Sequence, residues 1–351
     1  MEHERDVEDA LEREVRDRIG RAAHDYFAGG AGAEITLRDN HAAWNRIALA
    51  PRVLRGVGER DTAVTLLGER RRHPVLVAPM AYQRHAHDEG ELAMARGAAA
   101  TGTPMILSSQ TTTAPADVAR AMGETARWMQ LYVFRDRALS FEIVEAAREG
   151  GYEALVITVD FPLGGRRDRE IASGFTATHP TFLNHGENLS PDVRHTRHDP
   201  DLTWDDIAVF AEASALPVVL KGILHPADAE LAVQAGAAGL VVSNHGGRQL
   251  DTVVSGADAL APVIDAVDGR ADVLVDGGVR RGWDVAKAIA LGANGVLVGR
   301  HALWGLARGG AEGVERVLSD LVDEFDSTLA LLGCRTPDEL SRDHILTAPW
   351  A

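Results

Sequence analysis

Short apolar runs alternate with longer helical segments from residue 73 to about residue 300. The runs are rich in Val, Ile and Leu without strict alternation, which is typical of parallel strands buried on both faces. Segments of helical period lie between them, for example 89–100, 141–149, 226–235 and 283–291. The eight expected strands are 73–79, 104–109, 128–133, 154–160, 217–223, 239–245, 272–278 and 295–300.

Eight strand–helix units in about 230 residues predict an α/β fold of the (β/α)₈ TIM-barrel type. An open doubly wound sheet is the alternative, and it is disfavoured because no G-x-G-x-x-G sequence opens a helix after an early strand. We expect a single domain over 1–351, with an N-terminal helical extension over 1–72. Amphipathic helices are expected at 5–20 and at 311–332, where Gly333 ends the last one.

The interval after the fourth expected strand is much longer than the others. Residues 163–202 contain several His, Gly, Pro and Asn residues and little periodicity. A loop of this length in a compact domain is usually a lid or a binding loop, or is disordered. We expect a lid over the substrate. The sequence Thr203-Trp204-Asp205-Asp206 then predicts a capping box at the start of the next helix.

Composition narrows the classes of partner and compartment. The net charge of −16 argues against a nucleic acid or an anionic membrane as partner. The single cysteine, Cys334, excludes an intramolecular disulfide framework and a cysteine-based metal cluster, and no metal site is expected. No apolar run approaches the roughly 18–20 residues that span a bilayer. The acidic N-terminus lacks the apolar stretch of a secretory signal, so we expect a cytoplasmic protein.

The carboxyl ends of the expected strands carry most of the polar residues that interrupt the apolar pattern. In a TIM barrel these ends surround the active site. A structural role explains any one of these residues, but hardly the set. The ends are Pro79-Met80-Ala81, Ser108-Ser109, Gln130 with Tyr132, Thr158 with Asp160, Lys221, Ser243 with His245, Asp276 with Gly278, and Gly299-Arg300.

Two of these ends suggest acid–base chemistry on an anion. Lys221 ends an apolar run, so its amine either extends to solvent or meets an anionic partner inside the site. A histidine followed by two glycines and an arginine, His245 to Arg248, suits a substrate with a proton to remove and a carboxylate to bind. Asp160 either orients His245 or caps the end of its strand.

The last two strand ends predict a phosphate site. The sequence Asp276-Gly277-Gly278-Val279-Arg280-Arg281 and the pair Gly299-Arg300 supply backbone N–H groups and guanidinium groups. They follow the strands after which TIM barrels commonly bind phosphate.

With these motifs in hand, the chain resembles the FMN-dependent 2-hydroxy-acid oxidase and dehydrogenase family, which includes glycolate oxidase, lactate oxidase and the mandelate and hydroxymandelate oxidases. The resemblance extends from about Tyr26 to the final helix. Its most specific segments are 243–251 (Ser-Asn-His-Gly-Gly-Arg-Gln-Leu-Asp) and 276–282 (Asp-Gly-Gly-Val-Arg-Arg-Gly).

The resemblance implies a role for each matching residue. His245 is the base, Asp160 its partner, and Lys221 stabilises negative charge at the flavin N1/O2 edge. The substrate carboxylate is bound by Arg167 and Arg248, with help from Tyr26 and Tyr132. The implied FMN contacts are Pro79, Met80, Ala81, Ser108, Gln130, Thr158, Lys221, Ser243, Asp276, Gly278, Arg280, Gly299 and Arg300.

Departures from the family pattern concern the substrate pocket. Gln110 stands where the glycolate enzymes have tryptophan, and Gly164 where they have leucine. Met80 and Tyr82 also differ from those enzymes, and Tyr82 resembles the hydroxymandelate oxidases. Smaller side chains widen a pocket, so we predict a substrate larger than glycolate, of the lactate, mandelate or hydroxymandelate type.

The implied reaction is oxidation of an (S)-2-hydroxy acid to the 2-oxo acid, with O₂ reduced to H₂O₂. A dehydrogenase with another acceptor and a lactate 2-monooxygenase remain alternatives. An FMN-dependent isomerase is more remote, because it needs no His-Gly-Gly-Arg carboxylate site. The resemblance also implies a homo-oligomer, a tetramer or an octamer of tetramers.

Overall fold

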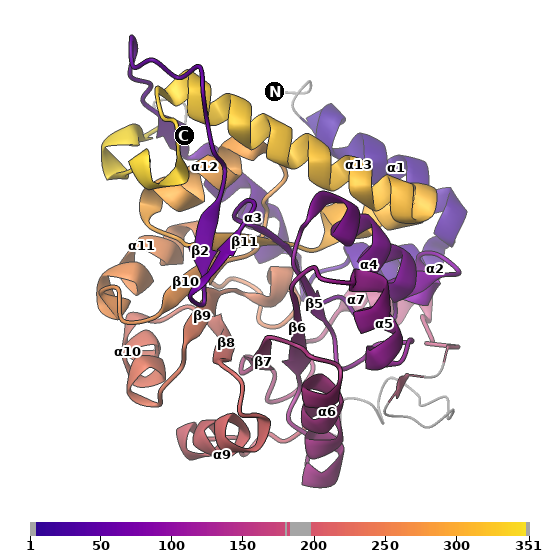
Figure 1. Cartoon of the computed structure of the whole chain (residues 1–351). Coiled ribbons are helices and arrows are strands. Elements are labelled where there is room, and N and C mark those ends of the chain that lie inside the picture. The colour runs from indigo at the N-terminus through magenta and orange to yellow at the C-terminus, as the bar shows by residue number, and fades with distance from the viewer. Residues whose placement is uncertain (1–4, 180, 183–197, 349–351) are drawn as a thin grey trace.

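Eight parallel strands close into a barrel in the order β10-β11-β4-β5-β6-β7-β8-β9 (Figure 1). This computed structural model describes residues 5–179, 181–182 and 198–348. Every barrel strand overlaps one of the expected apolar runs, so the predicted barrel is confirmed. Pairing of β11 with β4, which places Val298 beside Val77, closes the ring and excludes the open sheet. The strands are β4 (Val75–Val77), β5 (Met105–Leu107), β6 (Arg127–Leu131), β7 (Ala154–Thr158), β8 (Val218–Ile223), β9 (Gly239–Val242), β10 (Asp272–Val275) and β11 (Gly295–Val298).

Helices surround the barrel and follow the predicted segments. The expected capping box at Thr203 and Asp206 is present at the start of α9. The last helix begins earlier than expected, at Arg300, and is interrupted at Gly309 and Gly310 before it ends at Gly333. The outer helices are α4 (Gly90–Thr101), α5 (Pro115–Met122), α6 (Arg137–Glu149), α9 (Trp204–Ser214), α10 (Pro226–Gln234), α11 (Gly256–Val267), α12 (Gly282–Leu291) and α13 (Arg300–Leu332).

The barrel interior is filled and closed at its amino-terminal end. Trp128, Ile106 and Leu274 are fully buried in one apolar cluster inside the ring. Leu66 joins this cluster from a hairpin made by β2 (Val64–Leu66) and β3 (Glu69–Arg71). Because side chains fill the centre and the hairpin covers one end, a ligand site has room only at the carboxyl ends of the strands.

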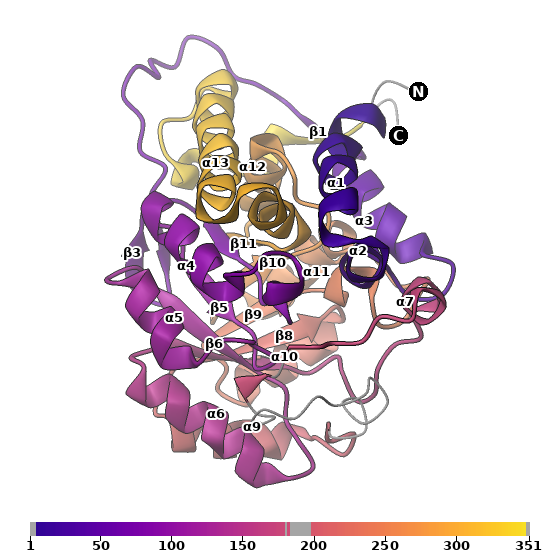
Figure 2. The ribbon, with the colours of Figure 1, turned by 90° about the vertical axis from the view of Figure 1, so that its right-hand side faces the viewer.

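Residues 5–49 pack against α13, β12 (Ile345–Thr347) and the barrel. Helix α1 (Arg5–Ile19) lies along α13, and α2 (Arg21–Ala28) follows it (Figure 2). Helix α3 (Ile35–Asn45) contacts the loop after β9, and β1 (Ile47–Leu49) pairs with β12. No helix in the described part of the chain is long and apolar enough to cross a bilayer.

The long segment after β7 contains a helix that its weak periodicity did not predict. Helix α7 (Asp168–Ser173) packs beside α2, as Figure 2 shows. The remainder of the predicted lid includes residues 180 and 183–197, which lie outside the described residues. Short 3₁₀ turns complete the structure: η1 (Gln83–His85), η3 (His245–Gly247), η4 (Pro337–Glu339) and η5 (Arg342–His344).

Candidate active site

A cavity opens at the carboxyl ends of the barrel strands. It encloses about 1310 Å³, including its open mouth. The predicted residues converge on it from every barrel strand end, from α2 and from the segment after β7. Those that line it are Tyr26, Pro79, Met80, Ala81, Ser108, Tyr132, Thr158, Arg167, Lys221, His245, Arg248, Asp276, Gly278, Arg280, Gly299 and Arg300.

Two of the predicted flavin contacts lie behind the cavity wall and hold residues that line it. Gln130 accepts hydrogen bonds from Ser108 Oγ (3.2 Å) and Ser109 N (3.0 Å), and donates to Thr158 Oγ1 (3.0 Å). Ser243 Oγ accepts from Lys221 Nζ (2.8 Å) and from His245 N (3.0 Å). Both are buried, at 1% and 0% exposure, so the hydrogen bonds seen here position their neighbours.

His245 lies between Asp160 and Tyr132. Its Nδ1 is 3.0 Å from Asp160 Oδ1, and its Nε2 is 3.2 Å from the hydroxyl of Tyr132. Because an ionised carboxylate accepts only, Asp160 assigns the ring proton to Nδ1 and leaves Nε2 as the basic atom. Asp160 thus orients the imidazole; it is not merely a strand-end cap.

Burial and pairing set the protonation of this group. Burial lowers the pKa of His245, although the Asp160 carboxylate opposes the shift. Burial raises the pKa of Asp160, but the stronger combined influence of His245 and Lys221 leaves it below its usual value. Burial also raises the pKa of Tyr132, so its phenol keeps its proton. The site therefore holds a neutral imidazole beside a carboxylate at neutral pH.

Arg167 and Arg248 approach each other at the mouth of the cavity. Arg248 Nη1 donates to the carbonyls of Tyr26 (2.6 Å) and Gly29 (2.8 Å), and its guanidinium lies 5.0 Å from the centre of the Tyr26 ring. Arg167 Nε donates to the carbonyl of Arg248 (3.2 Å). Burial, followed by the nearby Arg167 charge, lowers the pKa of Arg248 to about 10.

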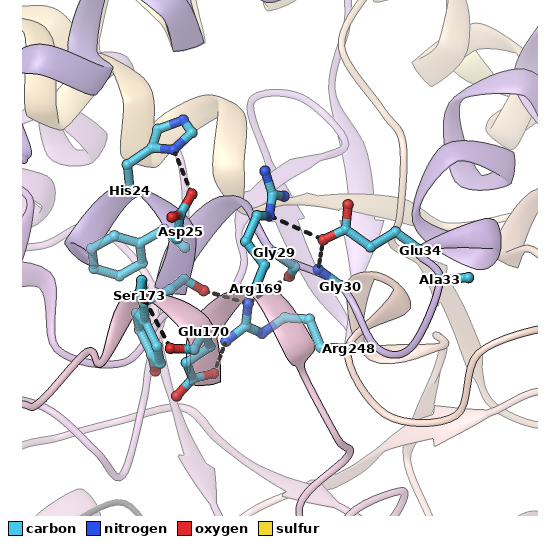
Figure 3. Close-up of polar contacts among 12 residues, drawn as sticks. His24, Asp25, Gly29, Gly30, Ala33, Glu34, Arg169, Glu170, Ser173 and Arg248 are labelled. Carbon is cyan, nitrogen blue, oxygen red and sulfur yellow. Dashed lines mark hydrogen bonds and ion pairs between the residues drawn. The ribbon is translucent and has the colours of Figure 1, made fainter. Parts of the chain in front are cut away.

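Glu170 lies between these arginines and was not predicted as a site residue. Its Oε2 is 3.0 Å from Arg167 Nη1 and 3.9 Å from Arg248 Nη2. Figure 3 shows the contact with Arg248. Its spacing of three residues from Arg167 is that of a helical ion pair, which is the signal that could have identified it. The signal was hidden because no helix was expected in this segment.

Lys221 is buried at 5% exposure, which excludes the solvent-extended alternative. Its Nζ lies 2.9 Å from Asp276 Oδ2. The other carboxylate oxygen, Asp276 Oδ1, is buried and has no hydrogen-bond partner among the described residues. An unsatisfied buried acceptor at the cavity wall fits a ligand that brings a hydroxyl donor.

Two further arginines, Arg280 and Arg300, line the cavity, and Arg300 shares the Gly29 carbonyl with Arg248. Arg300 donates to the carbonyls of Phe27 (2.8 Å), Gly246 (2.9 Å) and Gly29 (3.1 Å), and burial lowers its pKa to about 9. Arg280 lies 3.3 Å from His41 Nε2, and burial with the Arg280 charge lowers the pKa of His41 to about 3. Two partly buried arginines beside a neutral histidine favour a bound anion such as phosphate.

Helix α3 supplies cavity residues that sequence reasoning missed. Asn40 and His41 line the cavity, and Asn40 exchanges two amide hydrogen bonds with Asn244, at 3.0 and 2.7 Å. A Cβ on Gly278 would lie 1.9 Å from the carbonyl oxygen of Asn40. Helix α3 precedes the barrel by about 30 residues, and nothing in its pattern indicates this contact.

Tyr82 and Gln110 form part of the wall. The hydroxyl of Tyr82 donates to Gln110 Oε1 at 3.1 Å, and both residues line the cavity together with Met80. Gly164, which was expected to widen the pocket, is not among the described residues that line it.

Comparison with known proteins agrees with this geometry. The model of the FMN-dependent dehydrogenase family matches residues 15–347. An L-lactate oxidase from Nostoc sp. is 43% identical over 92% of this chain and 93% of its own length. A glycolate oxidase from Spinacia oleracea is 42% identical over 96% of this chain and 94% of its own length. A crystal structure of mandelate oxidase with (S)-4-hydroxymandelic acid matches at 40% identity with a TM-score of 0.89, covering 96% of this chain and 97% of that one. The chain belongs to the FMN-dependent dehydrogenase family and, within it, to the 2-hydroxy-acid oxidases.

Proposed function

We propose that His245 is the base that takes the substrate's proton when this FMN-dependent enzyme oxidises an (S)-2-hydroxy acid to the 2-oxo acid. The observation that carries this proposal is the line of contacts from Asp160 through His245 to Tyr132, at 3.0 and 3.2 Å. Asp160 orients the ring and stabilises the imidazolium that forms, as a carboxylate does for a histidine base.

The substrate carboxylate is bound by Arg167 and Arg248. Both guanidinium groups line the cavity that contains His245; Arg167 is buried and Arg248 is partly buried, which strengthens a charged hydrogen bond. The hydroxy acid lies between Tyr26 and Tyr132. The Tyr26 ring faces the Arg248 guanidinium, and the Tyr132 hydroxyl lies beside His245 Nε2. Binding at two points orients C2 and excludes water from it.

FMN fits the rest of the cavity. Asp276 Oδ1 offers an acceptor for a ribityl hydroxyl, Lys221 offers a cation, and Arg280 with Arg300 offers charge for the phosphate. The remaining contacts belong to Pro79, Met80, Ala81, Ser108, Thr158, Gly278 and Gly299, with Gln130 and Ser243 behind them. When bound, FMN supplies the acceptor for the two electrons of the substrate and passes them to O₂, giving H₂O₂.

The substrate is larger than glycolate. A Tyr82–Gln110 pair lines the wall, and similar solved structures include mandelate oxidase with (S)-4-hydroxymandelic acid. These features support lactate, mandelate or hydroxymandelate as the substrate type. A non-oxygen acceptor or a lactate 2-monooxygenase reaction remains the alternative, and the isomerase alternative is set aside because the dehydrogenase family matches residues 15–347.

Anaerobic mixing of the holoenzyme with a panel of 2-hydroxy acids tests the function. We expect wild-type flavin absorbance to bleach and to return in air with H₂O₂ formed, with higher kcat/KM on larger acids than on glycolate. His245→Ala should retain FMN, and its rate of flavin bleaching by the substrate should fall by about 10²-fold or more. His225→Asn, at the N-cap of α10 outside the cavity, is the control. Near-normal bleaching in His245→Ala would refute the base assignment.

Tetrameric assembly, or an octamer of tetramers, and a cytoplasmic location stay predictions. Val53 and Leu54 are 77% and 101% exposed in the segment between β1 and β2. Large exposed apolar side chains support a protein contact at this segment. Light scattering of wild-type and Leu54→Asp protein tests it, with a smaller mass expected for the variant.

A further inference from the structure

Glu170 is a carboxylate buried between the two arginines of the substrate site. It stands in the first turn of α7 and is 9% exposed, while Arg167 is 6% exposed. One oxygen, Oε2, faces both guanidinium groups, at 3.0 Å from Arg167 and 3.9 Å from Arg248. Figure 3 shows Glu170 directed at the guanidinium of Arg248.

Lys221 and His245, two other residues that line the cavity, have carboxylate partners of their own. Lys221 pairs with Asp276, and His245 pairs with Asp160. Arg248 otherwise donates to neutral carbonyls, those of Tyr26 and Gly29. Among the described residues, Glu170 is the ion-pair partner of both Arg167 and Arg248. Arg167, Arg248 and Glu170 together therefore carry one net positive charge.

The position of Glu170 is held from outside the site. Gly32 N donates to the carbonyl of Arg166 (3.0 Å), which ties the chain just before α7 to the loop after α2. Arg169 Nε donates to Glu34 Oε1 (3.1 Å), and the same oxygen accepts from Gly30 N (2.9 Å). Figure 3 shows the contacts of Glu34 with Arg169 and Gly30 beside Glu170, separate from its contact with Arg248. The carboxylate is thus fixed with respect to the loop whose Gly29 carbonyl binds Arg248.

We propose, on the basis of the function proposed above, that Glu170 is a positioning residue that holds Arg167 and Arg248 together with one net positive charge. Two buried guanidinium groups without a counterion repel each other and move apart. With Glu170 present, one substrate carboxylate completes the charge balance. A second carboxylate in the substrate would exceed the one net positive charge of Arg167, Arg248 and Glu170, so the enzyme selects acids with one carboxylate over diacids.

Oxalate and oxamate test the charge balance, because they have nearly the same shape and differ by one negative charge. Their Kd values are measured from the change in flavin absorbance of the holoenzyme. In Glu170→Gln we expect the Kd ratio of oxamate to oxalate to rise about fivefold or more, since the lost carboxylate repelled the second charge. Glu170→Asp, which keeps the charge, should restore the wild-type ratio within about twofold. Asp168→Asn, which removes a carboxylate from the exposed Arg166 pair on the same helix, should leave the ratio unchanged.

A second comparison applies even where Glu170→Gln fails to fold or to retain FMN. Arg167→Met leaves Glu170 to neutralise Arg248, whereas Arg167→Met with Glu170→Met restores one net positive charge. Replacing a buried ion pair by apolar residues is commonly tolerated. We expect the double variant to bind oxamate at least about fivefold more tightly than Arg167→Met.

Two results would overturn the role of Glu170. One is an unchanged Kd ratio of oxamate to oxalate in Glu170→Gln protein that folds and contains FMN. The other is a double variant that binds oxamate no more tightly than Arg167→Met. Failure of the proposed function looks different, because wild-type flavin would then not bleach with any 2-hydroxy acid.

Discussion

His245 and the two glycines after it have left-handed backbone conformations, with φ of 58°, 62° and 75°. A non-glycine residue in this region costs about 1 kcal/mol and persists only where its surroundings hold it. Here Ser243 Oγ accepts from His245 N, and Asn244 Oδ1 accepts from Gly247 N at 3.0 Å. The sharp turn after β9 lets His245 reach Asp160 and Tyr132 while Arg248 reaches the other side of the cavity.

The protonation of His245 predicts the pH dependence of Asp160→Asn. His245 is competent as a base only when neutral, above its pKa, so activity rises with pH through that pKa. The Asp160 charge raises the pKa of His245 against the effect of burial. Its removal should lower this pKa further, move the acidic limb of kcat/KM to lower pH, and reduce the maximal rate roughly 10²-fold or more. Measurement of kcat/KM for wild-type and Asp160→Asn protein between about pH 5 and 9 checks this prediction. An acidic limb displaced to higher pH in the variant would contradict it.

At the scale of elements, α3 and the loop after β10 together build the cavity wall around Gly278. Trp44 Nε1 donates to the carbonyl of Gly277 at 2.8 Å, and Gly278 approaches the backbone of Asn40 too closely for any Cβ. The buried Lys287 of α12 donates to the carbonyl of Trp44 at 2.8 Å. The end of α3 is therefore held between the cavity and the outer helices.

Gly278→Ala should weaken both FMN binding and folding. The backbone of Gly278 has φ of 82°, and a methyl group there would collide with Asn40 and displace α3. Gly236→Ala is a matched control, because Gly236 also has φ of 82° but nothing lies within 4 Å of its added Cβ. We expect the control to lose about 1–2 kcal/mol of unfolding free energy and to keep its FMN affinity. Gly278→Ala should lose more unfolding free energy and more FMN affinity than the control. Denaturant titration and FMN titration measure these two losses, and equal losses in the two variants would contradict this account.

At the scale of the whole molecule, the two ends of the chain are joined. Strands β1 and β12 pair through Ala48 and Leu346, and α1 packs along α13. Residues from α3 to the start of α13 line the cavity, so FMN bound there would connect these distant parts of the sequence.

Removal of FMN should lower the melting temperature. Ligand at 100 times its Kd stabilises the folded state by about 2.7 kcal/mol by mass action. Riboflavin, which lacks the phosphate, should stabilise the apoprotein less, because it leaves Arg280 and Arg300 without an anion. Calorimetry of apoprotein with each compound checks this. Equal stabilisation by both would place the phosphate away from these arginines.

The barrel and the chemical groups of the site were predictable from local patterns. Apolar runs of strand length predicted all eight barrel strands, and the carboxyl end of a strand is a fixed place in a TIM barrel. This is why His245, Lys221 and Asp276 were correctly assigned to the cavity. The extents of elements were less predictable: α7 is short and weakly periodic, and α13 begins within the last strand end rather than at 311.

The sequence by itself determined the barrel, the family and most of the residue types proposed to bind FMN and a hydroxy acid, because these depend on periodicity and on short contiguous motifs. Only the tertiary structure decided which side chains face the cavity and which brace its wall. Ser243 and Gln130 lie behind the wall, while Asn40, His41 and Glu170 come to the site from segments without a recognisable signal. The physical reason is that contacts between residues such as Asn40 and Asn244, 204 positions apart, depend on packing that no local pattern contains.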